Sequence, residues 1–315
     1  MSAAVVATAY GGPEVLEVVD VEVPSPGPGQ VTIEVRAAGI NPIDLKVYSG
    51  LMGRDESALP RRLGSEVSGV VTATGPGAHG PAGPLEVGDE VIGYRVSGGY
   101  AESITVEGDA VFPKPPSLSW EEAAGLSLTG VTATHLLEAT GVTAADTVLV
   151  HGVAGGVGLM TAQLALVRGA TVVGTAAEHR HAELRNFGIV PVAYGDGLVD
   201  RVRETAPGGV DVGLDTVGTD EAVDASLELV PDRRRIATIA AFGRAPDAGI
   251  RLLGNGPGAD PGTELRRAAR LPLADLAGRG RVRVVVARTF PLADVAEAHR
   301  LVQGGHAGGK VVLLP

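Results

Sequence analysis

Short apolar runs separated by glycine and proline fill the first 115 residues of the chain. The runs are rich in valine, isoleucine and threonine and partly alternate with polar positions, which is typical of β-strands. Clusters of turn-forming residues separate them at 24–29, 75–83 and 97–99. The predicted strands span 15–23, 31–37, 67–74, 90–94 and 101–106. We therefore expect an all-β, barrel-like organisation for this part.

From about residue 120 onward, buried strands alternate with helices. Ser119 is followed by Glu121 and Glu122, a combination that predicts the start of a helix over 121–137 with a glycine break. The predicted strands then span 148–150, 171–175, 190–193, 210–216 and 235–242, and the helices 159–168, 178–187, 198–205 and 220–229. This alternation predicts a doubly wound parallel sheet of the Rossmann type, an α/β fold.

The last part of the chain departs from this alternation. Residues 244–263 are rich in glycine, proline and aspartate and are predicted to form a mobile surface loop. The expected elements after it are a helix over 271–277, a strand over 282–286, a helix over 292–303 and a strand over 310–314. No internal repeat is found.

The corner between the strand at 148–150 and the following helix carries the strongest functional signal. Gly152, Gly155, Gly156 and Gly158 crowd this corner. Glycine permits a positive φ and lets a phosphate approach without meeting a Cβ. A glycine-rich turn that follows a strand, opens a helix and returns to a strand is typical of a dinucleotide diphosphate site. The alternative is an ordinary strand–helix turn without a ligand.

The end of the second strand bears on which dinucleotide is bound. An acidic residue there would bind the ribose 2′-hydroxyl of NAD, and basic residues would accept the extra phosphate of NADP. The strand is expected to end at Thr175, with Ala176 next and Glu178 and Arg180 shortly after. We favour NADP, with Arg180 as the phosphate partner. In the alternative, this stretch is a solvated helix start with Glu178 in its first turn.

Composition narrows the function further. A chain of 315 residues suits two domains, and 44% hydrophobic with 20% charged residues is typical of a soluble globular protein. No apolar run is long enough for a membrane span, and the N-terminus lacks signal-peptide features, so a cytoplasmic enzyme is expected. The absence of cysteine excludes disulfides and a thiol nucleophile. A net charge of −11 argues against a nucleic-acid partner.

Eight motifs carry a resemblance over nearly the whole chain. They are YGGPEVLEV (10–18), AAGINPIDLKVYSG (37–50), VGDEVIGY (87–94), GGYAE (98–102), LTGVTATHLL (128–137), VHGVAGGVG (150–158), LDTVG (214–218) and GHAGGKVVL (305–313). In this order they resemble the zinc-independent quinone oxidoreductase branch of the medium-chain dehydrogenase/reductase superfamily. The resemblance implies a GroES-like catalytic domain formed by 1–120 and 282–315, with a Rossmann domain at 121–281 inserted between them. It also implies a homodimer and an active site in the cleft between the domains.

Two positions differ from the zinc-dependent relatives. Asn41 and Ser65 stand where those relatives carry a Cys and a His, and a cysteine-rich lobe is absent. Neutral amide and hydroxyl groups cannot replace a thiolate and an imidazole as zinc ligands, so no metal is expected. The resemblance then implies hydride transfer from NADPH to a quinone or an α,β-unsaturated carbonyl. The alternatives are an enoyl reductase acting on a natural-product intermediate and a non-catalytic NADPH-binding redox sensor.

The resemblance and the glycine corner together assign candidate residues. The cofactor-binding set is Gly152, Ala154, Gly155, Gly156, Val157, Thr175, Ala176, Arg180, Tyr194 and Val217. The catalytic set is Asn41, Lys46, Tyr48 and Thr129. Gly155, Gly156 and Val157 would offer backbone N–H groups to the diphosphate.

Each of the remaining assignments has a simpler alternative. Tyr194 would lie near the adenosine phosphate, or it is only a half-buried strand-end tyrosine. Thr129 would contact the nicotinamide or the substrate, or it packs within a helix. Asn41 would bind the ribose or the substrate carbonyl, or it is a turn residue. Lys46 and Tyr48 could donate a proton to an enolate, as could solvent.

Four further polar residues are not expected to be catalytic. Asp44 is expected to be structural. His135, His151 and His299 are expected to pack or to form hydrogen bonds.

Overall fold

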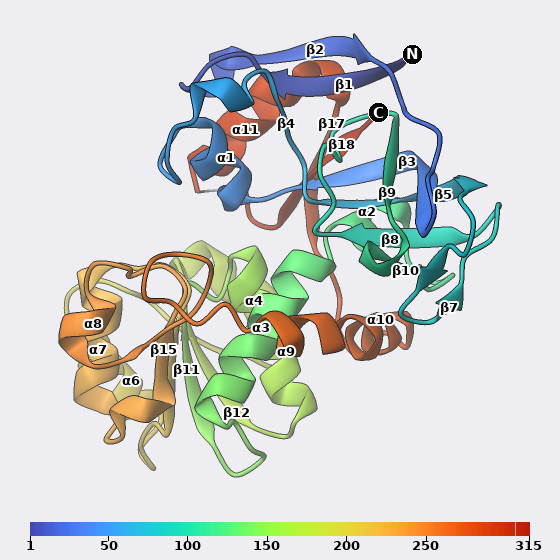
Figure 1. Cartoon of the computed structure of the whole chain (residues 1–315). Coiled ribbons are helices and arrows are strands. Elements are labelled where there is room, and N and C mark those ends of the chain that lie inside the picture. Colours follow the sequence, from blue (N-terminus) through green and yellow to red (C-terminus); the bar gives the residue numbers. More distant parts are fainter. Residues whose placement is uncertain (306) are drawn as a thin grey trace. The chain divides into compact units, whose positions relative to one another are not determined.

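A computed structural model describes residues 1–305 and 307–315. It divides into two compact units (Figure 1). The first unit comprises Met1–Leu128 and Arg270–Pro315, and the second comprises Thr129–Ala269. The domain boundaries predicted above, at 120/121 and 281/282, stay a prediction. His306, part of one motif, lies outside the described residues.

The first unit is built on mostly antiparallel strands, which confirms the predicted barrel-like organisation. Its larger sheet has the order β10-β8-β5-β3-β18-β17, with β9 also paired to β3, and a smaller sheet has the order β2-β1-β4. The strands are β1 (Ser2–Ala7), β2 (Leu16–Val21), β3 (Gln30–Ile40), β4 (Arg61–Arg62), β5 (Glu66–Thr74), β8 (Glu90–Tyr94), β9 (Ser103–Glu107), β10 (Val111–Pro113), β17 (Val286–Pro291) and β18 (Lys310–Leu314). Inward-facing residues such as Ile33, Val67 and Ile104 form its core.

Strand β1 was not predicted. Its residues pair with β2 in antiparallel register from Ser2 opposite Val21 to Ala7 opposite Leu16. The run is almost entirely apolar and fully buried at four successive positions, so it lacks the alternation that marks a half-buried strand. Its partner strand, rather than its own pattern, identifies it.

The second unit contains a six-stranded sheet in which every pairing is parallel, as predicted for a doubly wound fold. The strand order is β13-β12-β11-β14-β15-β16. The strands are β11 (Thr147–His151), β12 (Thr171–Thr175), β13 (Val190–Val192), β14 (Val212–Asp215), β15 (Ile236–Thr238) and β16 (Arg251–Leu252). Read in chain order this is 3-2-1-4-5-6, the arrangement of two mononucleotide-binding halves. The order reverses between β11 and β14.

Helices lie between the strands along the chain in both units. They are α1 (Pro42–Tyr48), α2 (Trp120–Ala124), α3 (Ser127–Thr140), α4 (Gly156–Val167), α5 (His181–Arg185), α6 (Leu198–Thr205), α7 (Asp220–Leu229), α8 (Ala245–Ala248), α9 (Thr263–Ala268), α10 (Arg270–Gly278) and α11 (Val295–Gln303). The predicted N-cap is confirmed, because the Ser119 oxygen accepts from Glu122 N and the Glu122 carboxylate accepts from Ser119 N. No helix in the described ranges is long and apolar enough to cross a bilayer.

Two predictions about the later part of the chain are wrong. Segment 244–263 is not simply a loop, because it contains helix α8 and strand β16, which extends the parallel sheet by one strand. Ile250 and Leu252 supply the apolar contacts that hold it. The strand expected over 282–286 begins only at Val286 and continues to Pro291. Val282 and Val284 are buried but precede the strand. Their apolar pattern therefore indicates burial and does not indicate pairing with another strand.

An ion pair ties the amino ends of two strands in the second unit. Asp146 directly precedes β11, and Arg235 directly precedes β15. The two guanidinium nitrogens of Arg235 donate to the two Asp146 oxygens, each over 2.8 Å. Hydrogen bonds from Arg235, reinforced by those from Thr143, lower the pKa of Asp146 to about 2.

Replacing this carboxylate should destabilise the second unit in a pH-dependent way. Because the folded pKa lies below the unfolded value of about 3.9, the contribution is complete above that value and is lost as pH falls toward 2. We expect D146N to lower the free energy of unfolding by about 2 kcal/mol at pH 7, with the difference from wild type shrinking as pH falls from 5 to 3. Urea unfolding followed by circular dichroism measures it.

Asp232→Asn is the matched control, because Asp232 and Arg234 form a similar pair that is largely exposed. It should change stability by less than about 1 kcal/mol. An equal effect of the two substitutions at every pH would contradict the role given to Asp146.

Candidate functional site

The carboxyl edge of the parallel sheet brings the predicted cofactor residues of the second unit together. Between β11 and β14 the strand order reverses, and a crevice for a ligand forms outside such a switch point. Gly152 follows β11, and Val217 follows β14. A Cβ on Gly152 would overlap the Val217 side chain, so the two loops meet there.

Three glycines of the corner are glycine for different reasons. Gly152 has φ +73°, a conformation that side chains disfavour. Gly158 packs so closely on Gly152 that a Cβ would overlap its carbonyl oxygen. Gly155 has an ordinary extended conformation, with φ −81° and ψ 165°, and a Cβ there would lie 3.3 Å from the Gly152 oxygen. The fold requires the first two glycines far more than the third, and Gly155 is exposed.

Helix α4 starts at this third glycine. Gly155 is its N-cap, and no side chain caps the helix. The N–H groups of Gly156, Val157 and Gly158 have no acceptor within the helix, and the helix dipole places partial positive charge there. Ala154 and Gly155 precede them on the same exposed turn. The geometry suits an anion such as a diphosphate.

The predicted adenosine side of the site lies at the ends of β12 and β13. Thr175 and Ala176 are buried, and the Thr175 hydroxyl oxygen accepts from Gly152 N over 3.1 Å. Arg180 pairs with Glu183, with N···O distances of 2.9 and 2.8 Å. Tyr194 follows β13 and is 59% exposed, which is more than the half-buried position considered for it. Among these residues Tyr194 is therefore the most accessible to a ligand, whereas Thr175 and Ala176 are covered.

His151, the last residue of β11, belongs to a buried polar network. His151 is hydrogen-bonded to Ser226 over 3.1 Å, and its carbonyl oxygen accepts from the Thr216 hydroxyl over 2.7 Å. Burial lowers the pKa of His151 to about 4, although nearby Asp215 acts in the opposite direction. This imidazole is therefore neutral at pH 7 and structural, as expected. The sequence feature that could have indicated this network is Asp215, an acidic residue at the end of an otherwise apolar strand.

Asn41 lies within a second buried network, in the first unit. Its amide nitrogen donates to Glu66 Oε1 over 3.0 Å, and its oxygen accepts from Lys310 Nζ over 2.6 Å. Lys310 also donates to Glu66 Oε1 over 2.6 Å. Glu66 is fully buried, and Asn41 is only 1% exposed. The Asn41 side chain therefore already has protein partners, and its contact with a ligand stays a prediction.

Tyr48 and Lys46 lie on the short helix that Asn41 opens. The Tyr48 hydroxyl lies 3.2 Å from His299 Nδ1, and burial raises the Tyr48 pKa to about 12. Burial also lowers the pKa of His299 to about 4, so this imidazole is neutral at pH 7 and can accept from Tyr48. Lys46 is half-buried on the same helix. The structure thus brings Asn41, Lys46 and Tyr48 onto one element.

Asp44 supports this helix as a structural residue, in line with the expectation. Its Oδ2 accepts from Asn41 N over 2.9 Å and from the Tyr100 hydroxyl over 2.8 Å. Burial raises the pKa of Asp44 to about 6, against the effect of these hydrogen bonds. Thr129, the fourth predicted catalytic residue, is buried near the start of α3 and belongs to the second unit.

Asn41 and Ser65 stand where the zinc-dependent relatives carry their Cys and His ligands, and neither is a usual zinc ligand. The Lys310 ammonium donates to both the Asn41 oxygen and Glu66 Oε1, so these two oxygens already have a cationic partner. Within residues 1–305 and 307–315, no group of three or more His, Asp or Glu side chains is arranged to hold a metal.

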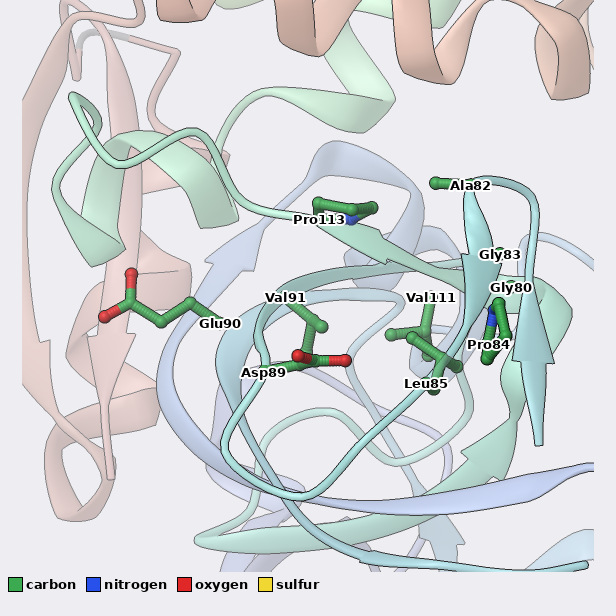
Figure 2. A pocket seen from close by; sticks show the side chains of 10 residues that line it. All are labelled: Gly80, Ala82, Gly83, Pro84, Leu85, Asp89, Glu90, Val91, Val111 and Pro113. Atoms are coloured by element: carbon green, nitrogen blue, oxygen red, sulfur yellow. The ribbon is translucent and has the colours of Figure 1, made fainter.

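A separate small pocket lies in the first unit, beside the hairpin of β6 (His79–Gly80) and β7 (Gly83–Pro84) (Figure 2). It encloses about 230 Å³, and its walls include Leu85, Val91 and Val111. This volume is below the usual size of a small-molecule site. None of the predicted site residues lines it, and we assign it no function.

Comparison with known proteins agrees with the two-part architecture. Residues 27–116 match the family model "Alcohol dehydrogenase GroES-like domain", and residues 190–313 match "Zinc-binding dehydrogenase". The chain is 34% identical to a quinone oxidoreductase of Pseudomonas aeruginosa, covering 98% of each chain. It is 32% identical to the quinone oxidoreductase of Mus musculus, over 97% of this chain and 95% of the relative.

Solved structures give the same picture. A quinone oxidoreductase of Escherichia coli complexed with NADPH has a TM-score of 0.86 and 28% identity, covering 99% of this chain and 100% of the other. An NAD-dependent alcohol dehydrogenase also has a TM-score of 0.86, with 30% identity over 99% of both chains. The fold is thus shared by enzymes that use different nicotinamide cofactors, so the choice between them depends on the side chains of this chain.

The Glu66–Lys310 pair generates a stability prediction. Removing the ammonium leaves a fully buried carboxylate without a cation, so K310M should lower the free energy of unfolding by about 3–5 kcal/mol. The double variant E66Q/K310M should recover part of this loss, because neither charge remains. Urea unfolding of the two single variants and the double variant measures the coupling.

Lys114→Met is the matched control. Lys114 is as buried as Lys310, but its partner Glu90 is half exposed, so the remaining carboxylate stays hydrated. This variant should lose about 1 kcal/mol. Similar losses in K310M and K114M, with no recovery in the double variant, would refute the coupling.

Proposed function

The chain belongs to the quinone oxidoreductase branch of the medium-chain dehydrogenase/reductase superfamily, and from this premise we propose that it transfers hydride from NADPH to a quinone or an α,β-unsaturated carbonyl without a catalytic metal. The reduced nicotinamide supplies the hydride when bound. The observation that supports this most directly is the uncapped start of α4 at the switch point of the sheet. At this helix start Gly155 has no side chain, although its ordinary backbone conformation does not require glycine.

Different residues of the second unit bind the diphosphate and the adenosine half of the dinucleotide. Gly156 and Val157 bind the diphosphate through their N–H groups, whereas the N–H of Gly155, also predicted for this role, already donates to the Gly152 carbonyl oxygen over 3.0 Å. Arg180 binds the 2′-phosphate by exchanging its pair with Glu183 for a doubly charged partner, and Tyr194 covers the adenosine side. The selection of NADPH over NADH rests on Arg180, because Glu178 is exposed beyond the strand end.

The residues of the first unit favour acceptors that need little activation. Asn41 and Ser65 provide no thiolate or imidazole for a Lewis acid, and the carboxylate of Glu66 is already neutralised by Lys310. Quinones and enones accept hydride without such help. The proton that completes the reduction comes from Lys46 or from solvent. Tyr48 is the weaker donor, because it is buried, its pKa is raised by burial, and its hydroxyl faces His299.

Two further features come from the family. We propose that Thr129 contacts the nicotinamide or the acceptor, as the resemblance implies. We also propose a cytoplasmic homodimer, which sedimentation at several protein concentrations would test for assembly.

Turnover tests the proposed reaction directly. Protein dialysed against a chelator should oxidise NADPH with a simple benzoquinone, followed by the loss of reduced-nicotinamide absorbance, and a panel of enones should define the acceptor. Binding of NADPH without oxidation by any acceptor would favour the redox-sensor alternative. A requirement for added zinc would refute the metal-free reaction.

Gly155→Ala tests the diphosphate site. A methyl group there narrows the space above α4 while staying 3.3 Å from the Gly152 oxygen, so the fold should tolerate it. We expect the dissociation constant for NADPH to rise about tenfold by fluorescence titration, a loss of about 1.4 kcal/mol. Gly208→Ala is the control, because Gly208 is exposed with no atom near its Cβ position. Unchanged affinity in G155A at unchanged stability would exclude this placement.

Arg180→Ala tests cofactor choice. NADPH affinity should fall about tenfold or more, whereas NADH affinity should change by less than about twofold, because only NADPH carries the phosphate. Arg185→Ala, which removes an exposed arginine at the end of helix α5, the helix that Arg180 precedes, should affect neither nucleotide. Equal losses for both nucleotides in R180A would place the phosphate elsewhere.

A further inference from the structure

Asp215 holds the loop that follows strand β14. It is the last residue of that strand and is fully buried. Its Oδ1 accepts from the backbone N–H groups of Val217 and Gly218, both over 2.9 Å. Its Oδ2 accepts from the Thr238 hydroxyl over 2.6 Å. One carboxylate thus fixes the first turn of the loop and reaches the neighbouring strand.

Thr238 holds the next loop in the same way. It ends β15, and its hydroxyl oxygen accepts from Ala240 N over 3.0 Å and from Ala241 N over 2.9 Å. Because that oxygen already accepts twice, its hydrogen is directed to Asp215. We call these two residues the Asp215–Thr238 clamp.

The loops held by the clamp also touch each other and the glycine corner. Gly218 has φ +83°, and a Cβ there would lie 2.8 Å from the Ala240 carbonyl carbon. Val217 lies over Gly152 and is nevertheless 47% exposed. The clamp therefore determines where Val217 stands on the exposed carboxyl edge of the sheet.

The clamp is chemically demanding. The hydrogen-bond partners of the Asp215 carboxylate among the described residues are two backbone N–H groups and one hydroxyl, with no cation among them, and His151 beside it is neutral at pH 7. A buried carboxylate without a cation costs free energy, so its hydrogen bonds are a poor choice if stability alone is required. An amide cannot replace it: whichever way it turns, its NH₂ group faces either the two backbone donors or a hydroxyl oxygen that already accepts twice.

We propose that Asp215, through Thr238, is a positioning residue for the nicotinamide half of the cofactor. This rests on the proposed function. In a sheet of two mononucleotide-binding halves, β12 and β13 serve the adenosine half, where Arg180 lies, so β14 and β15 serve the other half. The clamp holds Val217 and the loop at 239–241 in their final conformation before the cofactor arrives, which lowers the cost of binding.

Fragment binding distinguishes positioning from general stability. The probes are NADPH and adenosine 2′,5′-bisphosphate, which carries only the adenosine half with its phosphates. In D215N and T238V we expect the NADPH dissociation constant to rise about tenfold and kcat with benzoquinone to fall, whereas the bisphosphate constant stays within about twofold. T238S keeps the hydroxyl and should behave like wild type. In R180A both probes should weaken.

D146N is the matched stability control. Asp146 also forms a buried hydrogen-bonded carboxylate of the second unit, but at the amino edge of the sheet. It should lower stability without altering either probe. Equal weakening of both probes in D215N and T238V, or of neither, would overturn the proposal, and T238V with its T238S rescue decides if D215N does not fold. Failure of wild type to bind NADPH would instead refute the proposed function.

Discussion

The first N–H groups of α4 have no acceptor within the helix, and the N-cap, Gly155, has no side chain to offer one. Serine, threonine, aspartate and asparagine are the preferred N-cap residues because their side chains accept from these donors. This chain does so elsewhere, at Ser119 before α2 and at Thr219 before α7. Helices α5 and α6 also begin without a side-chain cap, so the missing cap indicates an anion site at α4 only together with the glycine-rich turn and the switch point of the sheet. The surrounding turn is shaped by glycines whose own packing explains two of them and not the third.

Two buried carboxylates solve the same problem of burial by different means. Glu66 in the first unit is neutralised by Lys310, and Asn41 accepts from the same ammonium. Asp215 in the second unit has only hydrogen-bond donors, two of them backbone groups of the adjoining loop. In the first arrangement the side chains bind one another, because the Lys310 ammonium donates to both Glu66 and Asn41. The second leaves the edge of the sheet open and fixes its loops. The proposed metal-free reduction would use both: a polar position whose side chains bind one another, and a rigid loop edge for the nucleotide.

The features that can be predicted from the sequence are those determined by residues close together along the chain. The glycine corner, the strand that precedes it and the N-cap at Ser119 are local signals, and the structure confirms these elements. Strand β1 could not be found this way, because only its pairing with β2 identifies it. The two-residue strand β16 was hidden among glycines and prolines, since its place is set by β15 and by the burial of Ile250. The site residues that the sequence missed are likewise long-range: Lys310 meets Glu66 across 244 positions.

The choice of cofactor shows where local reasoning stops being sufficient. Arg180 follows the strand end at the expected spacing, yet in the structure it already pairs with Glu183, one turn along the chain. The pair is partly buried, with the Arg180 side chain 17% and the Glu183 side chain 40% exposed, so a ligand must offer a stronger contact to replace it. A phosphate offers a stronger charge-assisted contact than the carboxylate it displaces. The pair therefore orients the guanidinium at the strand end without committing it. An acidic residue held at that place by a buried partner would have indicated the opposite preference, and Glu178 is exposed.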